Sequence, residues 1–186
     1  MKKFEEKTLL SQTLYEGRII NLDLEEVLLP NGNKSKREIV RHPGAVAVIP
    51  ITVDGKVVMV EQYRKALERA IVEIPAGKLE RGEEPELTAR RELEEETGYE
   101  CKQLTHLISF YTSPGFADEI VHLYVAEGLS KKDHKLDLDE DEFVEVLELT
   151  VEEALEYIQE QRIFDAKTAY AIQYLQLKRQ MDQNNG

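Results

Sequence analysis

The sequence predicts an α/β fold, in which one α/β domain follows an N-terminal arm of β-strands. Short segments rich in β-branched residues alternate with turn signals over much of the chain, whereas residues 85–97 and the residues after 150 show helical patterns. The chain has 186 residues, of which 41% are hydrophobic and 33% charged. This length and composition are typical of a globular domain with a sizeable core, because a chain near this size buries roughly 70% of its unfolded surface.

The first 43 residues are expected to form the strand arm, and residues 44–186 to form the main domain. Alternating and β-branched residues occupy segments 18–24 and 37–41. The Pro-Asn-Gly-Asn sequence at 30–33 is a strong turn signal, so a hairpin is expected between the two segments.

The main domain is expected to begin with strands at 45–52 and 56–61, because the Asp-Gly dipeptide between them is favoured in hairpins. A short strand is expected at 70–74. Residues 85–97 predict a helix, since a proline stands in the first turn and Gly98 follows as a C-terminal stop signal.

Two further strands are expected at 104–111 and 119–126, and another at 143–149 after an acidic segment. Thr150 and Glu153 have the spacing of a capping box, which predicts the start of a helix. Helical periodicity predicts a final helix over residues 165–181.

Composition and charge exclude several classes of protein. The formal net charge of -13 argues against nucleic acid or an anionic membrane surface as a partner. No window approaches the roughly 18 apolar residues of a membrane-spanning helix, and the acidic residues that follow Phe4 do not fit a signal peptide. The single cysteine, Cys101, provides neither an internal disulfide nor a cysteine-based zinc site. A cytoplasmic protein is therefore expected.

The negative charge is concentrated in two segments. Residues 83–96 carry seven Glu and two Arg, and residues 133–148 carry four Asp, four Glu and one Lys. Several of the first group lie at the end of the predicted helix, where each anion is disfavoured by about 0.3–1 kcal/mol. A solvated acidic face is one interpretation. The other is a cation site, since Glu92, Glu95 and Glu96 share one side of the helix and oxygen ligands select Mg²⁺, Mn²⁺ or Ca²⁺ rather than zinc.

The residues around this helix form a more specific pattern. The sequence from residue 77 onward fits G-x5-E-x7-R-E-U-x-E-E-x-G-U, where U is a bulky aliphatic residue. The matching residues are Gly77, Glu83, Arg91, Glu92, Leu93, Glu95, Glu96 and Gly98. Only Tyr99, at the last position, departs from the pattern. In these residues the chain resembles the Nudix hydrolases, which cleave nucleoside diphosphates linked to a further group. The resemblance implies a Nudix-type α/β/α sandwich with a mixed sheet, to which the N-terminal β arm is added.

The same resemblance implies roles for the residues of this box. Mg²⁺, with Mn²⁺ as an alternative, would bridge the phosphates and activate water. Its implied ligands are the carboxylates of Glu92, Glu95 and Glu96 and the main-chain carbonyl of Ala76. The implied structural residues of the box are Gly77, Glu83, Arg91 and Gly98, and the Glu83–Arg91 pair would organise the loop through charge-assisted hydrogen bonds.

Features outside the box resemble the ADP-ribose pyrophosphatase branch of this family. Segment 113–119, which contains a proline 15 residues after Tyr99, resembles a substrate loop whose final glutamate approaches the terminal ribose. Segments 37–41 and 61–64 resemble strands whose arginines contact adenine and phosphate. The residues assigned to substrate binding on this resemblance are Arg18, Ile19, Arg37, Glu38, Arg41, Arg64, Lys78, Ser113, Pro114, Gly115 and Glu119.

The implied reaction is hydrolysis of ADP-ribose to AMP and ribose 5-phosphate. Another nucleoside diphosphate sugar, such as GDP-mannose or ADP-glucose, is the alternative substrate, and Glu119 with the Arg37-Glu38 pair would discriminate between the two. A Nudix module that senses a nucleotide without cleaving it is less favoured, because such modules usually lose box carboxylates that this chain keeps. The resemblance also implies a homodimer whose N-terminal strands cross to the neighbouring subunit, so that the site is shared.

The general base is implied to lie in the second acidic segment. Glu140 is the first choice for the base, and Glu142 for a catalytic carboxylate that completes the metal site. Glu145 is the alternative base, and a solvated acidic loop is the alternative to all three. A carboxylate suits the task because water on Mg²⁺ is already acidified, so a weak base suffices.

We predict that Glu140→Gln lowers kcat on the order of 10²-fold while changing KM far less, since the base acts only in the chemical step. Steady-state kinetics with ADP-ribose measure both constants. A variant that retains most of its kcat would remove Glu140 from this role.

Overall fold

The computed structural model describes residues 3–80, 82–132 and 143–184, which group into two compact units. Met1–Ala45 and Ser109–Val121 form the first unit, and Val46–Ile108 with His122–Gly186 form the second. The segment at 109–121 is thus grouped with the N-terminal strands, although some 65 residues separate them in the sequence.

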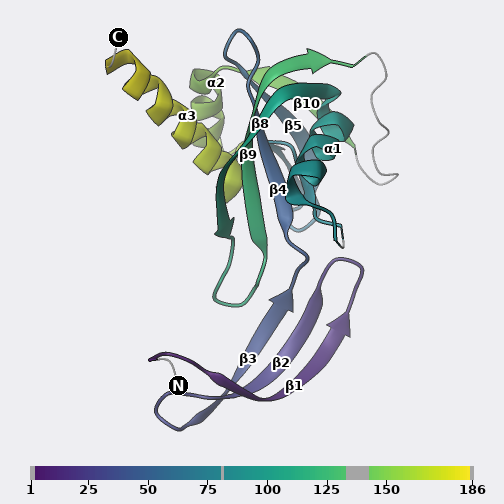
Figure 1. Ribbon diagram of the computed structural model, residues 1–186, viewed down its shortest axis with the longest axis vertical. Helices are drawn as coiled ribbons and strands as arrows, with labels where there is room; N and C mark the ends of the chain where they lie inside the picture. Colours follow the sequence, from purple (N-terminus) through teal and green to yellow (C-terminus); the bar gives the residue numbers. More distant parts are fainter. Residues whose placement is uncertain (1–2, 81, 133–142, 185–186) are drawn as a thin grey trace. The chain divides into compact units, whose positions relative to one another are not determined.

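The first unit contains an antiparallel sheet in the order β1-β2-β3 (Figure 1). Its strands are β1 (Lys7–Glu16), β2 (Asn21–Leu28) and β3 (Lys34–Arg41). The predicted hairpin between β2 and β3 is confirmed. The sequence did not predict β1, whose pairing with β2 is shifted twice, between Thr8 and Leu10 and between Thr13 and Tyr15. Each irregularity interrupts the alternation by which a strand is recognised.

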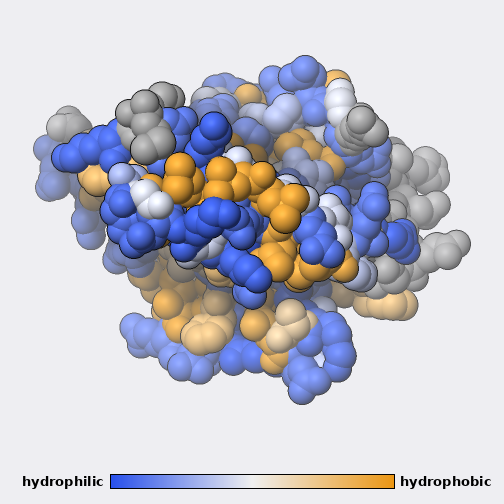
Figure 2. Space-filling model, turned by 90° about the horizontal axis from the view of Figure 1, so that it is seen from below, coloured by the Kyte–Doolittle hydropathy of each residue, from blue (hydrophilic) through white to orange (hydrophobic). Residues whose placement is uncertain are grey.

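The first unit leaves much of its apolar surface exposed. Every residue of β1 is exposed. Among the described residues of this unit, Val27 and Val121 are the apolar side chains that are buried. The large apolar side chains that lie exposed are Phe4, Leu9, Leu10, Leu14, Tyr15, Ile19, Tyr111 and Phe116. Apolar residues also form a band, bordered by hydrophilic ones, on the molecular face seen in Figure 2.

The second unit divides its strands between two sheets. One has the order β7-β4-β9-β8 and the other the order β10-β5-β6. The strands are β4 (Ala45–Pro50), β5 (Val57–Arg64), β6 (Arg69–Glu73), β7 (Ala76–Lys78), β8 (Tyr99–Tyr111), β9 (Ile120–Lys131) and β10 (Val144–Leu149).

The predicted β4–β5 hairpin needs a correction. The turn is present, with Gly55 at a φ of 80° that favours glycine. However, β4 and β5 belong to different sheets and meet in one antiparallel bridge, between Ile51 and Val57. Beyond this bridge β4 lies between β7 and β9 in one sheet, whereas β5 lies between β10 and β6 in the other.

Three helices complete the described part of the second unit and confirm its α/β/α arrangement. They are α1 (Pro85–Thr97), α2 (Val151–Gln159) and α3 (Ala166–Asn184). In Figure 1, α1 lies on one side of the strands and α3 on the other, and α2 contacts α3. None of the described helices is both long enough and apolar enough to cross a membrane.

The predicted bounds of α1 and the predicted start of α2 are confirmed by their caps, whereas α3 runs three residues beyond its predicted end at residue 181. Gly98 ends α1 in the left-handed conformation, with φ 73°, and its N–H donates to the carbonyl of Glu94 at 2.8 Å. At the start of α2, the Thr150 side chain accepts from the N–H of Glu153, and the Glu153 side chain accepts from the N–H of Thr150. This is the reciprocal capping box that the sequence predicted.

The core between α1 and the strands accommodates the unusual Tyr99. Its ring belongs to a buried cluster with Leu93 of α1 and Val46 of β4. The phenolic O–H reaches out of the cluster and donates to Glu148 Oε1 at 2.6 Å. Burial and this hydrogen bond raise the pKa of Tyr99. An aromatic residue therefore replaces the usual aliphatic one here without leaving its polar atom unsatisfied.

Candidate active site

Two carboxylates lie on the buried face of α1. The exposed fractions of Glu92 and Glu96 are 8% and 2%, and the two residues alternate on this face with Ala89 and Leu93. The spacing of four residues puts both carboxylates on the same side of the helix. Since a buried carboxylate is costly without polar partners, the surroundings of these two define what the site can do.

Glu96 is tied to the start of β7. The backbone N–H of Ala76 donates to Glu96 Oε2 at 2.9 Å. Ala76 is the residue whose carbonyl is a predicted metal ligand, so the structure brings these two predicted ligands together.

Glu92 occupies space that a side chain on Gly77 would need. A Cβ atom built on Gly77 would overlap the carboxyl carbon and both carboxyl oxygens of Glu92. The glycine is therefore required by the close approach of Glu92 to the backbone. Ala76 and Gly77 together form a backbone cradle for the two buried carboxylates.

Arg91 connects three acids around this cradle. Its Nη1 lies 2.7 Å from Glu95 Oε2 and 3.0 Å from Glu92 Oε1, and its Nη2 lies 3.3 Å from Glu83 Oε2. Burial opposes the positive charge of Arg91, but the hydrogen bond to Glu83 and the charges of Glu92 and Glu95 outweigh it and raise the pKa of Arg91. The same hydrogen bond is the main cause of a lowered pKa at Glu83.

The donors of this cradle fit a divalent cation by their chemistry, because carboxylate and carbonyl oxygens are the ligands that Mg²⁺ and Mn²⁺ prefer. In the described part of the chain, however, no three His, Cys, Asp or Glu side chains are gathered closely enough to hold a metal. Glu95 is instead turned to Arg91, which places a guanidinium among the carboxylates. Glu92 pairs with the same guanidinium, so a cation at the cradle would compete with Arg91 for both Glu92 and Glu95.

The predicted substrate loop is pinned to the end of β3 within the first unit. The carbonyl of Ser113 accepts from the N–H groups of Phe116 and Ala117. Asp118 forms hydrogen bonds at the end of β3: its N–H donates to the carbonyl of Val40, and its Oδ1 accepts from the N–H of His42, the residue after the strand, at 2.8 Å. Sequence reasoning missed Asp118, for which the only signal was its position directly before the predicted ribose contact, Glu119.

Glu119 and Arg41 both lie in this part of the first unit. Glu119 Oε2 accepts from Thr112 Oγ1 at 2.5 Å, and its Oε1 lies 3.8 Å from His42 Nδ1. Arg41 makes ion pairs with three carboxylates, those of Asp23, Glu25 and Asp118, at 3.1, 2.8 and 3.2 Å. These pairs hold the Arg41 side chain in place, and the hydrogen bond to Asp23 is the main cause of its raised pKa.

The remaining predicted residues are spread over both units. Arg37 forms a two-pronged pair with Glu6, through hydrogen bonds of 2.8 and 2.7 Å. Arg64 ends β5 and donates a hydrogen bond to Glu73. The sequence did not indicate Glu73 as a site residue. The predicted substrate contacts that are exposed to solvent are Arg18, Ile19, Glu38, Lys78, Pro114 and Gly115.

Of the three predicted catalytic carboxylates in the second acidic segment, Glu145 is the one that the structure describes. Glu145 is an exposed residue of β10, opposite Glu61 of β5. Glu140 and Glu142 lie outside the described residues, so their roles stay predictions.

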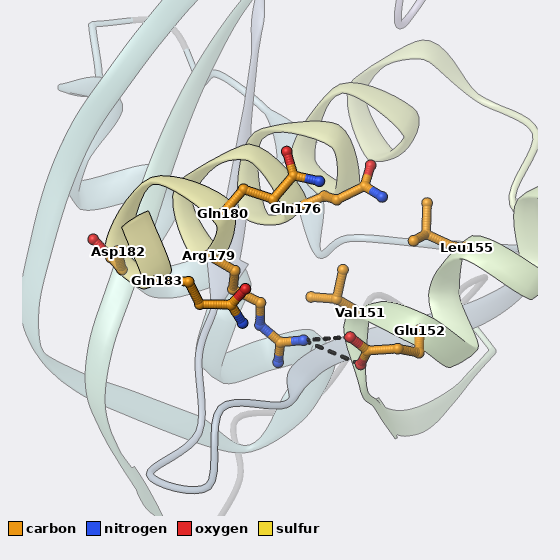
Figure 3. Close-up of a pocket in the computed structure, with 8 residues that line it drawn as sticks. All are labelled: Val151, Glu152, Leu155, Gln176, Arg179, Gln180, Asp182 and Gln183. Carbon is orange, nitrogen blue, oxygen red and sulfur yellow. Dashed lines mark hydrogen bonds and ion pairs between the residues drawn. The ribbon is translucent and has the colours of Figure 1, made fainter. Parts of the chain in front are cut away.

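A separate hollow of about 520 Å³ lies between α2 and α3 (Figure 3). Its walls include Val151, Leu155 and Gln176, and an ion pair between Arg179 and Glu152 closes one side at 2.9 Å. None of the predicted site residues lines it.

We predict that Gly77→Ala destabilises the protein by about 1–3 kcal/mol, because the added methyl group must displace the Glu92 carboxylate. The free energy of unfolding in urea measures this cost. Glu92→Ala is the matched background, since it removes the atoms that the methyl group would overlap. The cost of Gly77→Ala should fall below half in that background, and an equal cost in both would contradict this account of Gly77.

Comparison with known proteins identifies the family. The NUDIX domain matches residues 40–170, and the nucleoside diphosphate sugar hydrolase N-terminal domain matches residues 6–40. A methanol dehydrogenase activator of Bacillus methanolicus is 67% identical over 95% of this chain and 96% of its own length. An ADP-ribose pyrophosphatase of Bacillus subtilis is 64% identical over 96% of both chains.

More distant relatives extend this picture. A GDP-mannose pyrophosphatase of Cronobacter sakazakii is 36% identical over 80% of this chain and 82% of its own length. The crystal structure of an ADP compounds hydrolase shares the fold, with a TM-score of 0.83 over 98% of both chains at 21% identity. The domain match, the relatives and the box geometry agree: the chain belongs to the Nudix hydrolase family.

Proposed function

We propose that this protein hydrolyses the pyrophosphate bond of ADP-ribose to give AMP and ribose 5-phosphate. The observation that carries the proposal is the pair of buried carboxylates, Glu92 and Glu96, held against the Ala76-Gly77 backbone. ADP-ribose is favoured as the substrate by the 64% identical pyrophosphatase of that name, and GDP-mannose is less favoured because the relatives named for it are 36% identical.

Nudix hydrolases generally depend on a divalent metal ion, and we propose Mg²⁺, with Mn²⁺ as the alternative. When bound, the ion supplies a Lewis acid that neutralises phosphate charge and activates water. Glu92 and Glu96, with Glu95 and the carbonyl of Ala76, would hold it. Arg91 orients Glu92 and Glu95, because its guanidinium lies within 3.0 Å of both carboxylates.

The other residues of the proposed reaction act on the substrate or on a proton. Glu140 takes the proton of the attacking water, with Glu145 as the alternative base, and Glu142 supports the metal site. Arg64 binds a phosphate. Arg41 and Glu119 recognise the adenosine and ribose parts, with the positions of their side chains fixed by the ion pairs of Arg41 and the hydrogen bond from Thr112.

Release of AMP from ADP-ribose with Mg²⁺ tests this proposal. ADP-glucose, GDP-mannose and NADH serve as competing substrates, and EDTA as the metal control. We expect turnover that prefers ADP-ribose and stops in EDTA. A preference for another substrate would support pyrophosphate hydrolysis at the Nudix box but refute ADP-ribose as the preferred substrate. No turnover of any compound would indicate a protein that senses a nucleotide without cleaving it.

A second candidate function is activation of methanol dehydrogenase, favoured by the 67% identical relative of that name. Methanol dehydrogenase activity measured with and without the protein tests it. Glu96→Gln, which removes a buried box carboxylate, then shows whether activation needs the hydrolytic site.

We further propose a cytoplasmic homodimer in which the N-terminal strands cross between subunits and Arg18, Ile19, Arg37 and Glu38 complete a shared substrate site. The fully exposed β1 and the apolar residues on the first unit support this proposal. A small sheet rarely gains stability in water without a packed face, so a partner surface would cover these residues.

Removal of residues 1–40 is therefore expected to yield an inactive monomer, because it deletes both the interface and the shared contacts. Light scattering measures the mass, and the ADP-ribose assay measures the activity. A truncated monomer with full activity would contradict the shared site.

A further inference from the structure

Glu73 is a charged residue in an otherwise apolar stretch of the second unit. Its exposed fraction is 2%, and its neighbours Ile71, Val72 and Ile74 are buried. An apolar residue would pack at such a position without the cost of burying a charge. A carboxylate at this position therefore needs charged or polar partners.

The carboxylate of Glu73 holds two cations, one on each oxygen. Oε2 accepts from Arg64 Nε at 2.5 Å, and Oε1 accepts from Lys167 Nζ at 2.5 Å. Lys167, which is largely buried, also lies 3.0 Å from Asp165 Oδ1. Asp165 in turn accepts from the N–H of Thr168 in the first turn of α3, so the chain of contacts is anchored in a helix.

This arrangement leaves one end of Arg64 available. The hydrogen bond to Glu73 uses Nε, and no bond from Nη1 or Nη2 is found to any residue that the structure describes. The Arg64 side chain is 39% exposed, whereas that of Glu73 is 3% exposed. A buried carboxylate thus binds the Nε of a guanidinium whose side chain is partly exposed. The two Nη groups form the fork that binds phosphate oxygens well.

The register between β5 and β6 shows in which direction the Arg64 side chain extends to reach Glu73. Arg64 lies opposite Arg69, and Glu73 lies opposite Val60, so Arg64 must fold back along β5 to reach Glu73. Glu73 stands three residues before Ala76, the predicted carbonyl ligand. The ion pair therefore brings the Arg64 guanidinium toward the stretch of chain that leads into the carboxylate cradle.

We propose that Glu73, itself seated by Lys167, is a positioning residue that fixes Arg64 so that its Nη groups bind a phosphate of the substrate. This inference rests on the proposed hydrolysis of ADP-ribose and adds to it a residue outside the Nudix box. Glu73 acts through Arg64 and does not touch the substrate.

A double-mutant cycle tests the proposal. The variants are Glu73→Gln, Arg64→Ala and the double variant, and the measurements are KM and kcat for ADP-ribose with Mg²⁺. Glu73→Gln is expected to raise KM roughly tenfold with kcat changed by less than about threefold, because it weakens binding of ground state and transition state alike. In the Arg64→Ala background the same change should alter KM by less than about twofold, since the group on which Glu73 acts is absent.

Glu61→Gln is the matched control. Glu61 lies in β5, as Arg64 does, and forms an ion pair of 3.4 Å with Arg162. Loss of this pair should leave KM for ADP-ribose unchanged. Thermal unfolding of every variant separates loss of structure from loss of positioning. An unchanged KM in Glu73→Gln, or an equal rise in KM with and without Arg64, would overturn the proposal.

Binding of ADP-ribose in EDTA, measured by calorimetry, keeps this test separate from the test of hydrolysis. If the wild-type protein binds ADP-ribose but does not cleave it, the proposed hydrolysis is refuted. The positioning role is still supported if Glu73→Gln binds ADP-ribose roughly tenfold more weakly and the control Glu61→Gln does not. If the wild-type protein neither binds nor cleaves ADP-ribose, both proposals fail.

Discussion

The close contact between α1 and the Ala76-Gly77 backbone is the constraint on which the candidate site depends. One N–H of this backbone holds Glu96, and the missing side chain of Gly77 makes room for Glu92. These two features help to seat both carboxylates on the buried face of α1, because one supplies a hydrogen-bond donor and the other supplies space. The helix is fixed in turn by Gly98, whose left-handed conformation ends it directly after the acidic turn.

The chain that leads into this contact is held from two sides. Val72 N–H donates to the carbonyl of Arg162, and Ile74 N–H donates to Thr168 Oγ1 of α3. Two residues later, Ala76 N–H donates to Glu96 of α1. Alternate N–H groups of one short segment thus bond to elements from both helical layers. Glu73 lies in the middle of this segment, and the residues on either side of it are held by these hydrogen bonds, which favours the proposed positioning role.

Local signals in the sequence predicted the elements whose ends are set by local chemistry. α1 was predicted at its observed bounds, because Pro85 and Gly98 fix its two ends, and α2 was predicted from the capping box of Thr150 and Glu153. The elements that were missed depend on partners far away in the chain. β7 has three residues and is defined by its pairing with β4, and β1 is masked by two shifts in its register with β2. The same reason explains why Glu73 and Asp118 were missed, since their partners are remote residues such as Lys167 and Arg41.

The candidate site also shows how a chain of net charge -13 accommodates buried acids. Glu73 is matched by Arg64 and Lys167, while Glu92 is matched by Arg91, which also holds Glu95. Both groups therefore combine carboxylates with cations supplied by the chain itself. A divalent ion at the cradle would compete with Arg91 for Glu92 and Glu95, because a carboxylate oxygen that ligates a metal offers less charge to a guanidinium. Arg91 thus offsets part of the negative charge of the acidic turn, and a metal ion that used Glu95 as a ligand would have to displace this ion pair.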